Sequence, residues 1–213
     1  MSLLPMFLRL ERRPVLVVGA GTVALAKIES LRTTGAAITV VAPAAAPQLQ
    51  ELIENGDLTW HQRVFAPSDL EGAFLVIAAT NDSAVNHTVY EEALRRNVLC
   101  NAVDDPPNCD FYFGSIVTRG DLQIAISTAG ESPALAQRLR REIDEQLPGD
   151  LGPWLTELGA LRRKVRAAAP AGPARNLLLH ELAQRHLCNS PACPTRQFAR
   201  EQIAALQSEE VPA

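Results

Sequence analysis

The chain has 213 residues, of which 47% are hydrophobic and 21% are charged, so it can bury a core and is not disordered throughout. Its formal net charge of −4 argues against general binding to nucleic acid. No apolar run approaches the roughly 20 residues that span a bilayer, residues 1–13 lack the pattern of a secretory signal, and four cysteines are too few for a disulfide framework. We therefore expect a soluble cytoplasmic protein with no membrane and no nucleic-acid partner.

In the first half of the chain, short apolar runs alternate with segments of helical spacing. Strands are expected at residues 14–18, 37–41, 58–64, 74–79 and 98–103. Helices are expected at residues 22–34, 48–55 and 83–96, the last with Ser83 as its N-cap. This alternation predicts a parallel sheet with helices on both faces and right-handed connections between the strands.

After residue 107 the alternation stops. Two strands, at residues 111–118 and 122–127, are separated by a short turn and therefore predict a hairpin. Ser132 and Pro133 then open a helix that runs to about residue 147, with the serine as its cap and the proline in its first turn. The rest of the chain has helical spacing alone, so an α/β part, a small hairpin–helix unit and an all-helical part are expected to follow one another.

A glycine motif, Gly19-Ala-Gly21-Thr-Val-Ala24, lies between the first expected strand and the first expected helix. In dinucleotide-binding proteins the first glycine allows a tight turn, the second lets the backbone approach the pyrophosphate, and the small third residue lets helix and strand pack closely. Free N–H groups at the start of the helix then bind the anion. The motif predicts dinucleotide binding, and the alternative is a tight turn with a structural role only.

The end of the second expected strand carries no charged residue. Dinucleotide-binding proteins usually place an acid there to grip the ribose hydroxyls, but this chain reads Val41-Ala42-Pro43 and no arginine replaces the acid. We therefore expect backbone groups around Pro43 and Ala44 to hold the adenosine ribose. The same observation favours NAD over NADP as the cofactor.

Polar residues follow the fourth and fifth expected strands. Thr80 and Asn81 would lie at the carboxyl edge of the sheet, where ligands bind in this architecture. The alternative is a polar loop that caps the next helix through Asp82 or Ser83. Asp104 would face the nicotinamide end of the cleft as a general base or as a partner for a cationic intermediate, although Asp-Asp-Pro-Pro is also a plain turn signal.

Two further groups of residues raise the question of ligand binding. The hydroxyl-rich turn at residues 127–133 is suited to bind an anion through its backbone N–H groups, or simply to cap a helix. His180, His186, Cys188 and Cys193 match no standard zinc spacing. We therefore expect no metal site.

Taken together, the motifs resemble one family. In chain order they are Leu4-Pro-Met-Phe7, the run 17–24 with Lys27, Val40-Val-Ala-Pro43, Ala78-Ala-Thr-Asn81, Asn101-Ala-Val-Asp104 and the run 124–133. Six elements in this order resemble the precorrin-2 dehydrogenase/sirohydrochlorin ferrochelatase module of siroheme synthase. The resemblance covers residues 1 to about 150, and the helical tail matches the family only in kind.

The resemblance implies a fold and an activity. An N-terminal Rossmann-like, NAD-binding domain is expected at residues 1–112, a small α+β dimerisation unit at 113–148 and a helical C-terminal domain at 149–213. The family implies a homodimer that uses NAD to dehydrogenate precorrin-2 to sirohydrochlorin. In bifunctional members ferrous iron is then inserted, as a substrate, to give siroheme.

The resemblance also implies roles for individual residues. Residues expected at the cofactor are Gly19, Gly21, Thr22, Val23, Pro43, Ala44, Thr80 and Asn81. Asp104 corresponds to the family's catalytic aspartate, which serves both dehydrogenation and chelation. One well-placed carboxylate suits both steps, because each requires protons to leave the macrocycle.

The substrate carries many carboxylates, so arginines should line its cleft. We name as candidate substrate-binding residues Asn101, Arg119, Thr128, Ser132 and Arg138. Surface solvation is the alternative for the two arginines. Thr128 stands where some relatives have a phosphorylatable serine, and we expect the methyltransferase half of the fused enzymes to be absent.

Two other functions compete with the enzyme. A non-catalytic, NAD-sensing module would need no carboxylate at the nicotinamide end, so the segment from Asn101 to Asp104 favours catalysis. A chelatase or tetrapyrrole carrier that had lost NAD would not need the Gly19 and Gly21 turn.

Overall fold

The structure is a computed structural model that describes residues 3–183 and residue 201. The chain divides into two compact units, Met1–Phe113 and Gly114–Ala213. In the described part of the chain, no helix is both long enough and apolar enough to cross a membrane. The finer division into parts at 1–112, 113–148 and 149–213 stays a prediction.

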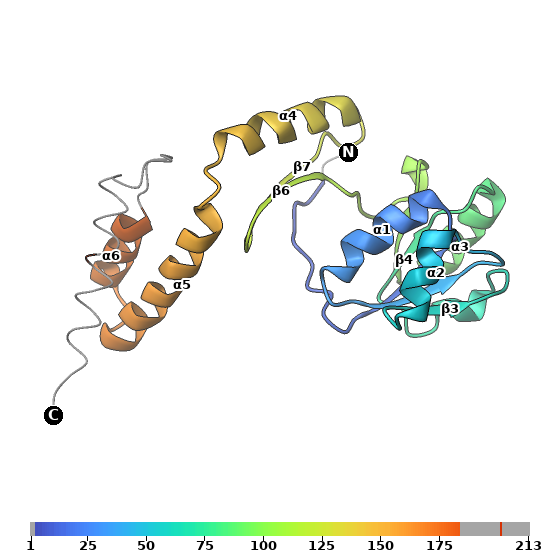
Figure 1. The fold of residues 1–213 in the computed structure, drawn as a ribbon, viewed down its shortest axis with the longest axis horizontal. Helices are drawn as coiled ribbons and strands as arrows, with labels where there is room; N and C mark the ends of the chain where they lie inside the picture. The colour runs from blue at the N-terminus through green and yellow to red at the C-terminus, as the bar shows by residue number, and fades with distance from the viewer. Residues whose placement is uncertain (1–2, 184–200, 202–213) are drawn as a thin grey trace. The chain divides into compact units, whose positions relative to one another are not determined.

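Five parallel strands form the sheet of the first unit, in the order β3-β2-β1-β4-β5. This unit is the part of the ribbon coloured from blue to green in Figure 1. They are β1 (Pro14–Val18), β2 (Ala37–Val41), β3 (Thr59–His61), β4 (Leu75–Ala78) and β5 (Leu99–Ala102). The predicted Rossmann-like parallel sheet is confirmed. Because the strand order reverses between β1 and β4, the crevice outside their carboxyl ends is where such sheets bind ligands.

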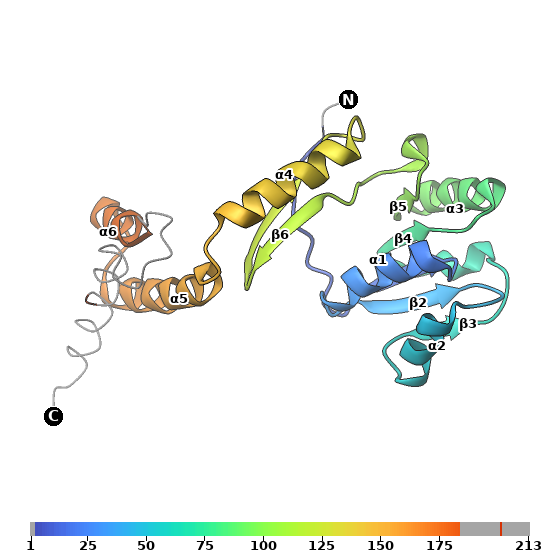
Figure 2. The ribbon, with the colours of Figure 1, turned by 45° about the horizontal axis from the view of Figure 1, so that its top comes forward.

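Helices cover both faces of this sheet (Figure 2). They are α1 (Thr22–Arg32), α2 (Pro47–Glu54) and α3 (Ser83–Arg96), with the short 3₁₀ turns η1 (Pro67–Leu70) and η2 (Pro106–Asn108). Side chains alternate between the two faces of a strand, so Val15 and Val17 pack with α1 and α2 while Leu16 and Val18 pack with α3. Because both faces of β1 are buried, the strand and the turn that follows it are held in place.

Two local expectations differ from the structure. The N-cap of α3 is Asp82, whose carboxylate accepts hydrogen bonds from the N–H groups of Ala84 and Val85, and Ser83 is the first helical residue. Strand β3 ends at His61 rather than at residue 64, because the chain turns there through a hydrogen bond from the Arg63 N–H to the His61 carbonyl.

The second unit contains a hairpin and three helices. They are β6 (Ser115–Arg119), antiparallel to β7 (Leu122–Ile126), followed by α4 (Pro133–Gln146), α5 (Leu151–Ala168) and α6 (Pro173–Ala183). The predicted hairpin and helices are confirmed, although the first strand of the hairpin begins at Ser115 rather than at residue 111. The hairpin turn meets the start of α5 so closely that a Cβ on Gly152 would come 2.9 Å from the Arg119 carbonyl oxygen. Helices α5 and α6 share a small core of Leu161, Val165 and Leu182.

Candidate functional site

The turn between β1 and α1 is built around Gly19. Its φ of +108° is a conformation that side chains rarely adopt, and a Cβ there would lie 2.4 Å from the carbonyl oxygen of Ala79. The Gly19 N–H donates to the Val41 carbonyl at 2.9 Å. The turn is therefore held against both β2 and β4, and only glycine fits.

The start of α1 offers unpaired backbone donors. Its N-cap is Gly21, which has no side chain to satisfy the first N–H groups, and no acid lies in the first turn. A Cβ on Gly21 would meet nothing within 4 Å, so open space lies beside this backbone. Thr22 and Val23 are exposed in the first turn, while Ala24 is fully buried against the sheet. Such a helix start favours an anion at its N-terminus.

The carboxyl end of β2 contributes backbone rather than charge. Trp60 donates its indole N–H to the Ala42 carbonyl at 3.0 Å, and Gln62 reaches the Pro43 carbonyl at 3.5 Å. These contacts hold the segment that contains Pro43 and Ala44 at the edge of the sheet, as the sequence predicts.

The carboxyl end of β4 is fixed by a residue that the sequence did not single out. Asn86, on α3, is buried and makes three hydrogen bonds with Thr80: its side-chain oxygen accepts from the Thr80 N–H at 3.2 Å and hydroxyl at 2.7 Å, and its amide donates to the Thr80 carbonyl at 3.1 Å. Thr80 and Asn81 are thereby held at the edge of the sheet. An isolated Asn in a helical segment carries no sequence signal for this role.

These three strand ends surround one cleft of about 570 Å³. That volume is within the range of cofactor sites. The predicted residues that line it are Gly19, Gly21, Pro43, Ala44, Thr80 and Asn81. Thr22 and Val23 are not among its lining residues, although their backbone belongs to the helix start described above.

Asp104 lies just beyond the end of β5, at the same edge of the sheet. Its side chain is exposed and its backbone has a φ of +62°, a left-handed conformation that Asp and Asn tolerate better than most residues. The Val103 N–H donates to the Ala78 carbonyl at 2.9 Å, which ties this turn to β4. Asp104 is not among the residues that line the cleft.

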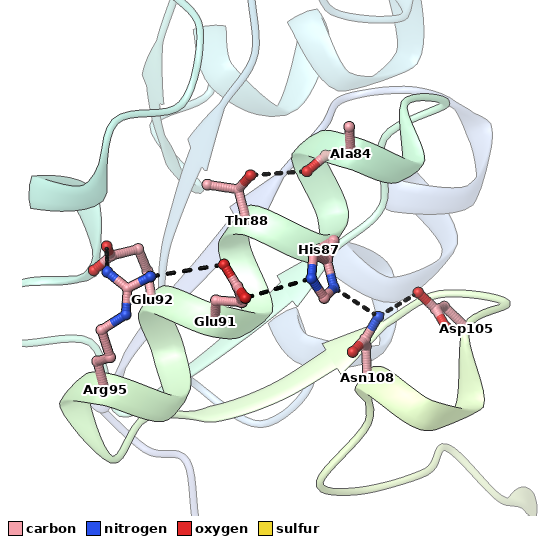
Figure 3. A network of polar contacts seen from close by, with 8 residues as sticks. All are labelled: Ala84, His87, Thr88, Glu91, Glu92, Arg95, Asp105 and Asn108. Carbon is pink, nitrogen blue, oxygen red and sulfur yellow. Dashed lines mark hydrogen bonds and ion pairs between the residues drawn. The ribbon is translucent and has the colours of Figure 1, made fainter.

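A polar network holds the segment after Asp104 against α3 (Figure 3). Asn108 donates to the Asp105 carboxylate at 2.6 Å and lies 3.4 Å from the Nδ1 atom of His87. The other ring nitrogen of His87 lies 3.5 Å from Glu91. The turn that carries Asp104 is therefore anchored on the helix that also fixes Thr80.

Asn101 takes a structural position. It is buried on β5 and its amide donates to the Phe111 carbonyl at 2.7 Å, with a weaker contact to the Cys109 sulfur at 3.4 Å. This contact closes the loop that returns past β5. A role of Asn101 toward substrate stays a prediction.

Lys27, on α1, is a charged neighbour of Asp104 that motif reasoning gave no role. Its ammonium lies 4.2 Å from the centre of the Phe113 ring. Burial lowers the pKa of Lys27, and the negative charge of Asp104 raises it by a smaller amount. Lys27 is therefore a half-buried cation that lies over the ring of Phe113 and is influenced by the charge of Asp104.

The remaining candidate residues belong to the second unit. Arg119 pairs with Asp144 at 2.7 Å and also donates to its carbonyl, and Arg138 pairs with Glu142 at 2.6 Å on the exposed face of α4. Thr128 accepts from the Ser132 N–H at 3.2 Å.

Ser132 caps α4 by accepting from the Leu135 N–H, as the sequence predicts. Among the described residues no cluster of His, Cys, Asp or Glu is suited to hold a metal ion. His186, Cys188 and Cys193 lie outside the described residues.

Comparison with known proteins agrees with this geometry. The family described as putative NAD(P)-binding matches residues 6–115, and the family described as sirohaem biosynthesis protein central matches residues 119–146. The chain is 48% identical to siroheme synthase 1 of Cronobacter sakazakii over 162 residues, which is 76% of this chain and 34% of that protein. It is 39% identical to siroheme synthase 1 of Aeromonas hydrophila over 209 residues, or 98% of this chain and 45% of that protein.

Among solved structures, the fold matches SirC, a precorrin-2 dehydrogenase. The TM-score is 0.81 at 27% identity, covering 97% of this chain and 100% of that one. The chain spans between a third and a half of the length of the siroheme synthases named above.

Proposed function

We infer the function from one premise: this chain belongs to the putative NAD(P)-binding family, as the N-terminal module of siroheme synthases does. We propose that it is a precorrin-2 dehydrogenase, which converts precorrin-2 to sirohydrochlorin with NAD as the hydride acceptor. The observation that carries the proposal is a shared sheet edge. The glycine cradle at Gly19 and Gly21 follows β1, and the exposed carboxylate of Asp104 follows β5, two strands away.

The residues at the cradle fit a dinucleotide. The uncapped start of α1 supplies N–H donors for a pyrophosphate, and the open space beside Gly21 leaves room for it. The backbone at Pro43 and Ala44 would hold the adenosine ribose, and Thr80 and Asn81 would border the bound cofactor. When bound, NAD supplies the chemistry of hydride acceptance.

Asp104 would take up the proton that must leave with each hydride. Dehydrogenation removes one hydride and one proton from the macrocycle, so the cofactor is reduced and the carboxylate is protonated. Asp104 then returns its proton to solvent, to which it is exposed.

We extend the proposal to iron insertion. Entry of ferrous iron into sirohydrochlorin releases pyrrole N–H protons, and Asp104 is a carboxylate suited to accept them at the same edge. Iron is here a substrate rather than a resident cofactor.

We also propose that the protein is a cytoplasmic homodimer. Its substrate-binding residues would contact the carboxylates of the tetrapyrrole. Arg119, Arg138, Thr128, Ser132 and Asn101 are the proposed substrate contacts. The arginines would exchange their present carboxylate partners for those of the tetrapyrrole.

The test is turnover of precorrin-2 by the purified protein with NAD. We expect NADH absorbance to grow in step with that of sirohydrochlorin, and a second incubation with sirohydrochlorin and Fe²⁺ tests chelation. Asp104→Asn is the sharpest variant, because asparagine also tolerates a positive φ and so keeps the turn. We expect it to lose turnover while its affinity for NAD stays within about threefold of wild type, a small change on the free-energy scale.

Asp105→Asn is the matched control, because it removes the neighbouring negative charge but keeps an oxygen that accepts the anchoring hydrogen bond from Asn108. We expect this variant to retain most of the turnover. Full activity of Asp104→Asn, or no turnover of wild type with either NAD or NADP, would refute the proposed enzyme; NAD binding without turnover would instead favour a sensing module.

A further inference from the structure

A closed ion pair lies beside the cleft, just past the end of β3. The guanidinium of Arg63 binds the carboxylate of Asp69 through two hydrogen bonds, of 2.8 and 2.5 Å. Asp69 also accepts the Ala66 N–H at 2.9 Å. Its side chain is only 8% exposed, whereas that of Arg63 is 44% exposed.

The pair is adjacent to the region where an adenosine ribose is expected. Val64 and Phe65, which directly follow Arg63, line the cleft together with Pro43 and Ala44. Strand β3 pairs with β2 up to the partners Val41 and His61. The carboxyl end of β3 is therefore the immediate neighbour of the edge at which dinucleotide sites distinguish a ribose hydroxyl from a 2′-phosphate.

The residues that line the cleft offer few charged groups that could distinguish a ribose hydroxyl from a 2′-phosphate. Among the described residues that line it, Asp82 is the one charged side chain, and its carboxylate is engaged as the cap of α3. The acid that usually repels a 2′-phosphate and the arginine that usually accepts one are both missing from the end of β2. Arg63 is the cation placed next to this edge.

We propose that the Arg63–Asp69 pair determines the preference for NAD over NADP, with Asp69 as the specificity-determining residue. The inference rests on the proposed function and names its cofactor more closely. With the pair closed, both arms of the guanidinium fork are occupied and its charge is neutralised, so a 2′-phosphate gains no cationic partner.

The pair resists being opened by a phosphate. If Arg63 turned toward a ligand, the carboxylate of Asp69 would be left almost buried without its counter-charge, which is strongly unfavourable. The hydrogen bonds from Arg63 lower the pKa of Asp69, so the carboxylate stays ionised and bound at neutral pH. A bare ribose hydroxyl, by contrast, needs no cation.

Asp69→Asn tests the inference. Asparagine retains an oxygen to accept the Ala66 N–H but loses the charge that holds Arg63. Isothermal titration calorimetry with NAD and with NADP should show tighter binding of NAD by wild type. In Asp69→Asn we expect the affinity for NADP, relative to that for NAD, to rise by about tenfold or more, as one new charged hydrogen bond to phosphate provides.

Two further variants serve as controls. The double variant Asp69→Asn with Arg63→Gln should lose the gain in NADP affinity, because the gain passes through the freed guanidinium. Asp57→Asn releases Arg32 from a similar ion pair that joins the end of α1 to the segment before β3, and it should leave the ratio unchanged.

The outcomes separate the two proposals. If wild type binds NAD and a folded Asp69→Asn keeps the wild-type ratio, this inference is overturned and the proposed function stands. If wild type prefers NADP, the inference is also overturned. If wild type binds neither dinucleotide, the proposed function falls and takes the inference with it.

Discussion

The two glycines of the β1–α1 turn should respond to substitution in opposite ways. For Gly19→Ala the methyl group would sit 2.4 Å from the Ala79 carbonyl oxygen, and the backbone would stay at a φ of +108°. A strained backbone costs about 1–3 kcal/mol and an overpacked site about 1–3 kcal/mol more. The neighbouring strands β1 and β4 are almost fully buried and cannot yield easily, so we expect a loss of about 2–6 kcal/mol in unfolding free energy.

Gly21→Asp should instead keep the fold and lose the cofactor. Its Cβ meets nothing within 4 Å, and Asp is a better helix N-cap than Gly by a few tenths of a kcal/mol. A carboxylate about 4 Å from a pyrophosphate charge costs about 4 kcal/mol at an effective dielectric constant of about 20. This corresponds to roughly a thousandfold weaker binding of NAD.

Urea denaturation and calorimetry with NAD separate these effects. Gly72→Ala is the control for Gly19→Ala, because Gly72 also has a positive φ but has open space where the Cβ would be. The difference between these two variants measures the overlap with Ala79 together with the extra strain of a φ of +108° compared with one of +75°. Equal destabilisation of Gly19→Ala and Gly72→Ala, or wild-type affinity for NAD in Gly21→Asp, would refute the reasoning.

Three more predictions concern single side chains. Hydrogen bonding by Arg63 lowers the pKa of Asp69 below its usual 3.8, so the stability that the carboxylate contributes is present above about pH 4 and is lost as the pH falls through the lower native value. Urea titrations should therefore show the gap between wild type and Asp69→Asn shrinking in acid, and a constant gap would contradict this. Asn86→Ala leaves polar groups of Thr80 without partners and should cost about 1–3 kcal/mol while weakening NAD binding; unchanged stability would rule out the anchoring role. Burial raises the pKa of Cys100 to about 12, so mass spectrometry should find its thiol unmodified by iodoacetamide at neutral pH unless the protein is unfolded.

The sheet could be predicted from the sequence because its signals are local. The apolar run that forms β1 and the glycine that ends it lie within a few residues of each other, so propensity and position agree. The same holds for Ser132, whose hydroxyl caps a helix that begins at the next residue. The cap of α3 was misplaced by one residue, because Asp82 and Ser83 are both good caps and only the backbone geometry decides between them.

The contacts that brace the cleft could not be predicted, because each depends on the folded arrangement. Asn86 meets Thr80 only because α3 packs back along the strand that precedes it. Lys27 contacts the ring of Phe113, which lies 86 residues later in the chain, and no sequence motif predicts the contact. Side-chain pairs of this kind, whether near or distant in the chain, leave no periodic pattern in a single sequence.

Backbone groups, rather than side chains, explain why so short a motif predicts the site. The proposed pyrophosphate cradle uses N–H groups that every residue except proline carries, so the sequence reveals them only where a side chain must be absent. Gly19 is required by the close approach of Ala79, and Gly21 leaves the donors of α1 uncovered. The proposed preference for NAD over NADP depends on side chains instead. Arg63 and Asp69 lie six residues apart in an irregular segment, and no cofactor-binding motif includes such a pair. The glycines therefore predict a site for the pyrophosphate, which NAD and NADP share, whereas a prediction about the 2′-substituent requires the folded structure.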